Sequence, residues 1–98
     1  MTLIASQDTF INQDKETENK GDDNELKIKP DSNKVIRPLL KFDLSSIPAG
    51  ATVNAATLRL YVTREKEGQT VNIHRVAQNW GEGTGNNGSG ADWNSYDG

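Results

Sequence analysis

The sequence predicts an all-β fold, either a β-sandwich or a jelly roll, and three observations lead to this prediction. Several short segments alternate apolar and polar residues at a spacing of two, which is the spacing of a half-buried strand. Polar stretches rich in turn-forming residues, such as residues 12–25, separate these segments. No long segment has apolar residues at the three- and four-residue spacing of a helix, which argues against α/β folds and helical bundles.

The clearest alternation lies in residues 56–63, and residues 70–77 repeat it. Residues 65–69 join the two segments with charged side chains and a glycine, a composition typical of a turn. We therefore expect the two segments to form a β-hairpin. Its inward face would carry Leu58, Leu60, Val62, Val71 and Ile73.

A further strand is predicted over residues 35–44, where Leu40, Phe42 and Leu44 share one face. Because proline cannot donate to a ladder, Pro38 should lie at an edge, at a bulge or where this strand enters the sheet, with pairing beginning after it. A short turn should follow, since serines can cap one helical turn that proline and glycine then break. That turn covers residues 45–52, and weaker strand candidates are residues 3–5, 9–11 and 25–29.

Length and composition limit the possible functions. The 98 residues allow one domain, and the apolar share of 33% lies below the roughly 45–50% of ordinary domains, so the core should be slim. A net charge of −3 without a basic block argues against a nucleic-acid partner. No apolar run approaches the roughly 18 residues of a membrane span. The absence of cysteine excludes disulfides and thiolate metal sites.

The middle of the chain contains the segments LLKFDLSSIPAGATV (residues 39–53) and AATLRLYV (residues 55–62). With these segments it resembles the DNRLRE domains, also called disaggregatase-related repeats. The flanking segments DTFI, VNIHRV and WGEG, at residues 8–11, 71–76 and 80–83, are also similar. The resemblance implies a secreted or cell-surface β-sandwich, attached to polysaccharide-degrading enzymes and surface proteins, with some members grouped among carbohydrate-binding modules. It also implies a domain that is not itself catalytic.

Residues 1–98 resemble the N-terminal part of such a domain, because these domains continue with further strands after a segment like ADWN at residues 91–94. A sheet that lacks strands leaves backbone groups unpaired, so we expect something to complete it. Three explanations stay open at this point. The missing strands come from another chain or copy, the chain is an engineered truncation, or it adopts a smaller rearranged fold.

Three aromatic residues flank a glycine-rich loop at residues 81–90 and are candidate ligand-binding residues: Trp80, Trp93 and Tyr96. Flat exposed rings can stack on the apolar faces of sugars, while neighbouring amides and carboxylates bind the hydroxyls. The structural alternative is that Trp80 plugs one end of the sandwich. Basic residues are a second candidate set, since clustered cations bind an acidic polysaccharide such as a uronate polymer. These residues are Lys27, Lys29, Lys34 and Arg37, with solvated strand faces as the ordinary alternative.

Oxygen-rich side chains at Asp22, Asp23 and Asn24 are a candidate calcium site, although their spacing differs from that of an EF-hand loop. A hydrated acidic loop is the alternative. Catalysis finds little support, because the single His74 lies in a predicted strand and the serines at 45 and 46 have no neighbouring base. The leading hypothesis is a carbohydrate-binding or adhesion module that binds polysaccharide. The alternative is a structural subunit of a surface fibre or oligomer, assembled by strand complementation.

Overall fold

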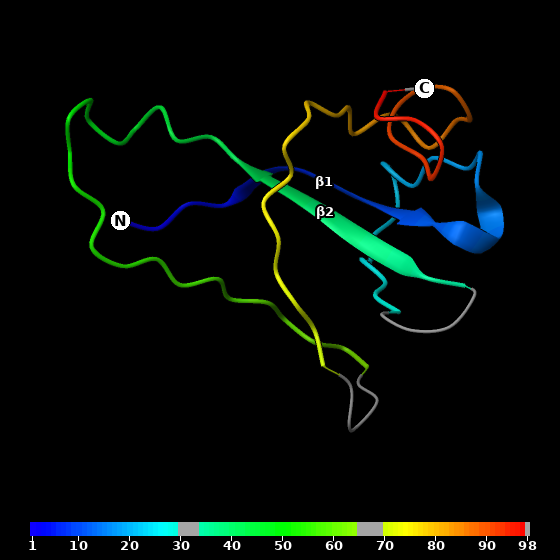
Figure 1. Cartoon of the computed structure of the whole chain (residues 1–98), viewed down its shortest axis with the longest axis horizontal. Helices are drawn as coiled ribbons and strands as arrows, with labels where there is room; N and C mark the ends of the chain where they lie inside the picture. The colour runs from blue at the N-terminus through cyan, green and yellow to red at the C-terminus, as the bar shows by residue number, and fades with distance from the viewer. Residues whose placement is uncertain (30–33, 65–69, 98) are drawn as a thin grey trace.

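Two antiparallel strands form the only regular sheet in the part of the chain that the structure describes. A computed structural model describes residues 1–29, 34–64 and 70–97. Strand β1 (Ala5–Asn12) runs into the short 3-10 turn η1 (Gln13–Lys15), and strand β2 (Ile36–Phe42) returns beside β1 (Figure 1). The predicted all-β class is confirmed. No helix among the described residues has the length and apolar character needed to cross a membrane.

The pairing register explains why Pro38 is accepted inside β2. Ile36 exchanges both backbone hydrogen bonds with Lys29, on the edge of β2 that faces away from β1. Backbone N–H and C=O groups alternate in direction along an antiparallel strand, so the backbone of Pro38, two residues further on, also faces this outer edge. The N–H group that proline lacks is therefore not one that would bond to β1. Pairing with β1 already begins at Ile36, opposite Asn12. The edge position of Pro38 was therefore predicted correctly, but the expectation that pairing begins after it was wrong.

The core is slim, as the composition predicts. Among the described residues the buried apolar side chains are Phe10 and Ala91, accompanied by the buried polar residues Thr9, Asn19 and Asp92. Phe10 comes from β1, and Ala91 comes from the C-terminal segment that lies beside β1 in Figure 1. The core therefore joins the beginning and the end of the chain.

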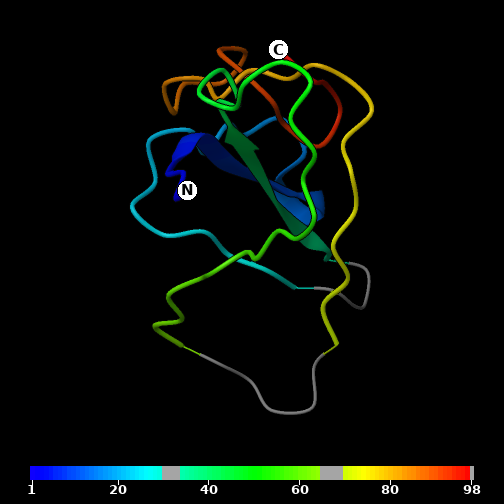
Figure 2. The same ribbon diagram turned by 90° about the vertical axis from the view of Figure 1, so that its left-hand side faces the viewer.

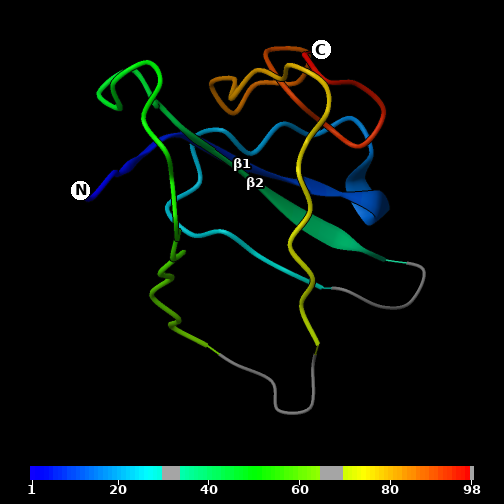
Figure 3. The ribbon, with the colours of Figure 1, turned by 60° about the vertical axis from the view of Figure 1, so that its left-hand side comes forward.

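The predicted hairpin is absent, and this is the largest correction to the sequence analysis. Residues 56–63 and 70–77 have no strand partner among the described residues, and the two segments run apart rather than side by side (Figures 2 and 3). Leu60 is 61% exposed and Ile73 is 76% exposed, so neither lies on an inward face. Alternation shows which side chains would share a face, but a strand also needs a partner for its backbone groups. The predicted connecting turn lies outside the described residues.

The turn after β2 is stabilised by Asp43. Its Oδ1 atom accepts a hydrogen bond from the backbone N–H of Ser45 at 2.9 Å, and Ile47 N–H donates to Leu44 O at 3.0 Å. The serine-rich segment thus forms a turn, as predicted, although it is not helical. The hydrogen bonds from Ser45 lower the pKa of the Asp43 carboxyl, and the nearby Lys41 ammonium adds a smaller effect in the same direction.

We expect an NMR titration to place the pKa of Asp43 below that of the unfolded chain. A carboxyl whose pKa is lowered by folding stabilises the folded state above its unfolded pKa, and this contribution is lost as pH falls through the folded pKa. Ser45→Pro removes the donating N–H, so the midpoint should rise toward the ordinary value. Equal midpoints in the folded and unfolded wild-type chains would contradict this assignment.

Candidate functional site

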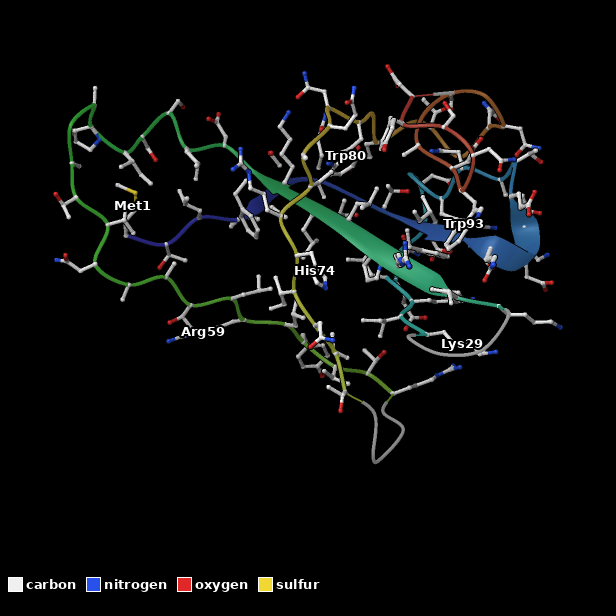
Figure 4. The ribbon with its side chains drawn as sticks, viewed as in Figure 1. Met1, Lys29, Arg59, His74, Trp80 and Trp93 are labelled. Atoms are coloured by element: carbon white, nitrogen blue, oxygen red, sulfur yellow. The ribbon has the colours of Figure 1, made fainter. Side chains whose placement is uncertain are left out.

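A groove lies between the C-terminal part of β2 and residues 74–80, with a volume of about 440 Å³. Residues 74–80 cross β2 (Figure 4), so two segments that are distant in sequence form its walls. Its lining combines apolar, amide and cationic side chains. These residues are Leu40, Lys41, Phe42, Leu44, His74, Arg75, Val76, Gln78, Asn79 and Trp80.

The backbone beside Trp80 is fixed by the residue that follows it. Gly81 N–H donates to Tyr96 O at 2.9 Å, and Gly81 O accepts from Ala91 N–H at 2.7 Å. Both partners belong to the C-terminal segment, and Ala91 is buried. Trp80 is half-buried. The backbone next to Trp80 is therefore held in place by hydrogen bonds, while part of the Trp80 indole stays exposed.

The chemistry of the groove suits a polar ligand that also has apolar faces. Phe42 and Trp80 supply aromatic surface, and flat rings of this kind pack against apolar C–H faces. Gln78 and Asn79 supply amides, which can both donate to and accept from hydroxyl groups. Lys41, His74 and Arg75 are exposed on the same lining and can donate to carboxylates.

A second, more open hollow has a volume of about 690 Å³ and is lined by residues 13–18 and Lys34. Its lining is polar and contains no aromatic ring. Lys20 Nζ lies 2.8 Å from the carboxylate of Glu18, and this hydrogen bond lowers the pKa of Glu18. The groove beside Trp80 is therefore the better candidate for a ligand with apolar faces.

Trp93 lies apart from this groove and contacts another predicted ligand-binding residue. The guanidinium carbon of Arg37 lies 5.3 Å from the centre of the Trp93 ring, within the range of a cation–π interaction. The backbone N–H of Trp93 donates to Glu16 O at 3.1 Å. Arg37 thus already occupies one face of the Trp93 ring, so only the other face could stack on a sugar.

The remaining predicted ligand-binding residues are exposed and do not line the groove. Lys29 uses its backbone to bond Ile36, and Figure 4 places it well away from Trp80. Lys27 and Tyr96 are likewise exposed. Of the predicted ligand-binding residues, Arg37 and Trp93 contact each other. Trp80 lies instead among groove residues that were not predicted from the sequence. These are Lys41, His74, Arg75, Gln78 and Asn79.

The predicted calcium ligands lie on the exposed segment that faces the glycine-rich loop. Asp23 Oδ1 accepts a hydrogen bond from Glu25 N–H at 3.0 Å, and the Asp22 carboxylate fills the space that a side chain on Gly85 would need. Across residues 1–29, 34–64 and 70–97, no three histidine, cysteine, aspartate or glutamate side chains gather as a metal site would require. Calcium binding by Asp22, Asp23 and Asn24 stays a prediction.

Asn19 is the structural residue that sequence reasoning missed. Its side chain is 2% exposed and joins residues 17–21 to the glycine-rich loop. Asn19 Nδ2 donates to Glu82 O at 2.9 Å and to Ala91 O at 3.0 Å. Asn19 Oδ1 accepts from Gly21 N–H at 3.1 Å and from Gly85 N–H at 2.9 Å. No local sequence signal marks this role, because the partners lie more than sixty residues away in the chain, apart from Gly21.

Comparison with known families gives a match that covers nearly the whole chain. Residues 1–94 match the model of carbohydrate-binding module family 96. Neither the curated proteins nor the solved structures that were compared with the chain gave a match. The carbohydrate-binding character implied by the sequence resemblance is therefore confirmed at the level of the family.

Proposed function

Because this chain belongs to carbohydrate-binding module family 96, we propose that it binds a polysaccharide through the groove beside Trp80. The observation that carries this proposal is the combination of an aromatic ring, amides and cations in one groove. In this arrangement Trp80 stacks on an apolar sugar face, while Gln78 and Asn79 exchange hydrogen bonds with hydroxyl groups.

The cations of the groove favour an acidic polysaccharide as the ligand. Lys41 and Arg75 line the groove together, and its lining contains no aspartate or glutamate. Arginine binds carboxylates through two parallel hydrogen bonds, which suits the carboxylates of a uronate polymer. The chain as a whole carries a net charge of −3, so the groove differs in sign from the molecule around it.

The proposed role is that of a non-catalytic module at the cell surface or in a secreted protein. Glycoside hydrolysis ordinarily uses a pair of carboxylic acids on either side of the scissile bond. The groove lining offers neither a carboxylate nor a hydroxyl or thiol nucleophile. The resemblance of residues 39–62 to the DNRLRE domains supports the extracellular setting.

Titration against neutral and acidic polysaccharides tests this proposal. We expect Arg75→Gln to weaken binding of an acidic polysaccharide about tenfold, because a charge-assisted hydrogen bond contributes about 1.5 kcal/mol or more. Lys27→Gln is the matched control, since it removes one exposed positive charge that lies outside the groove lining. An equal loss in both variants would point to bulk charge, and no binding to any polysaccharide would contradict the proposal.

Strand complementation is the second candidate, and the unpaired apolar segments favour it. Leu60, Val62 and Ile73 are each more than half exposed, in segments with the alternation of a strand. Beyond the bridge at Ile36, the outer edge of β2 has no strand partner among the described residues. Such an edge accepts an extended segment from another chain, and a second copy carries a suitable segment at residues 56–63.

Light scattering over a range of protein concentrations tests this second candidate. Assembly by strand donation predicts dimers or larger species whose share increases with concentration. Leu60→Ser should reduce assembly, because it removes an apolar contact from the donated strand, whereas Thr57→Ser on the opposite face should leave it unchanged. A folded monomer at every concentration would rule this candidate out.

A further inference from the structure

The tip of the glycine-rich loop, residues 86–88, is exposed although both of its ends are held in place. Gly85 N–H, just before the tip, donates to Asn19 Oδ1 at 2.9 Å. Ser89 Oγ, just after the tip, lies 3.3 Å from the same oxygen. The loop therefore has a fixed base and a solvated tip.

We propose that Asn87, in this tip, is a site of spontaneous deamidation. The backbone nitrogen of Gly88 attacks Cγ of Asn87, so that an N–Cγ bond forms, the Cγ–Nδ2 bond breaks and ammonia leaves with the proton of the attacking nitrogen. Water then opens the resulting succinimide to aspartate or isoaspartate. The reaction consumes one water and releases one ammonia, without an oxidant or cofactor. It changes the net charge from −3 to −4, since one carboxylate is gained.

The residue after Asn87 makes this position chemically favourable. Gly88 has no Cβ, and apart from its two neighbours in the chain no heavy atom lies within 4 Å of the place that a Cβ would take, so no distant part of the protein crowds this glycine. In the part of the chain that the structure describes, neither Gly88 N–H nor the Asn87 side chain makes a hydrogen bond. Asn87 is also the only asparagine in the sequence that precedes glycine.

Asn94 provides an internal comparison, because it is also exposed but differs in the residue that follows it and in the hydrogen bond of that residue's N–H. The residue after it is Ser95, whose Cβ hinders approach and whose N–H donates to Asp92 O at 3.4 Å. Asn94 N–H donates to Asp92 Oδ1 at 2.9 Å, which holds its own backbone in a turn. Deamidation should therefore be much slower at Asn94 than at Asn87.

Incubation of the purified chain at mildly alkaline pH, followed by peptide mapping with mass spectrometry, tests the proposal. We expect Asn87 to be converted about tenfold faster than Asn94, a ratio that needs only a modest difference in barrier height. Asn87→Gln should abolish the fast reaction, whereas the matched variant Asn86→Gln should retain it. Conversion of Asn87 no faster than Asn94 would overturn the proposal.

The same measurement in concentrated urea tests the structural part of the inference. If the folded loop leaves the tip free, the rate at Asn87 should change little on unfolding, while the buried Asn19 should stay unmodified in the folded chain. A rate at Asn87 that increases strongly in urea would show that the folded loop protects it, and would overturn the claim that its geometry is favourable.

Discussion

Replacing Trp80 by alanine is expected to weaken polysaccharide binding about thirtyfold or more. Trp80 is the tryptophan of the groove, and truncation of a central aromatic side chain in a binding site ordinarily costs about 2 kcal/mol or more. Isothermal titration calorimetry with the best ligand from the polysaccharide panel measures this loss. Stability should be checked on the same samples by urea unfolding, because Trp80 is half-buried.

Trp93→Ala is the matched control for this result. Trp93 stacks with Arg37 outside the groove, so its removal should cost about 0.5–1 kcal/mol of stability from the cation–π contact, with further loss from packing. Polysaccharide affinity should stay within about twofold of the wild type, a change of about 0.4 kcal/mol. A loss of affinity in Trp93→Ala that equals the loss in Trp80→Ala would place the binding surface elsewhere.

Replacing Asn19 by alanine is expected to destabilise the fold by about 3 kcal/mol or more. The substitution leaves Glu82 O, Ala91 O and Gly85 N–H without their partner in a largely buried place, and each unsatisfied group costs about 1–3 kcal/mol. A total of about 3 kcal/mol is a large share of the stability of a small domain. Urea unfolding followed by tryptophan fluorescence measures the change.

Asn86→Ala is the control for Asn19→Ala, because it makes the same chemical change in the exposed loop tip. The side chain of Asn86 makes one long contact, with Nδ2 3.4 Å from Thr84 Oγ1. The expected change in stability is within about 0.5 kcal/mol. Similar effects in the two variants would mean that Asn19 does not hold the loop in solution.

The sequence predicted the elements that depend on local pattern. The segment at residues 35–44 contains β2 (Ile36–Phe42), and the low apolar share anticipated a core with few buried apolar side chains. The turn at Ser45 was also predicted, since its stabilising contact with Asp43 is two residues away. These features need no information about distant parts of the chain.

Features that depend on distant contacts could not be predicted in this way. Alternation in residues 56–63 satisfies the pattern of a strand, yet this segment has no strand partner in the described part of the chain. Asn19 reads as one more polar loop residue, and only the folded chain brings Glu82 and Ala91 to its side chain. The groove cations were missed for the same reason, because Lys41 and Arg75 come from segments that meet only after folding.

The most direct test of the proposed function uses the two indole N–H signals of the chain, which has two tryptophans. The chain is titrated with the polysaccharide that it binds, or with oligosaccharides of it, and followed by ¹H–¹⁵N NMR. Each of the variants Trp80→Ala and Trp93→Ala removes one indole signal and so assigns it. Binding in the groove predicts a saturable shift of the Trp80 indole signal, while the Trp93 signal, from a ring outside the groove, stays in place. A shift of the Trp93 signal alone, or of neither signal at saturating ligand, would contradict a polysaccharide site at Trp80.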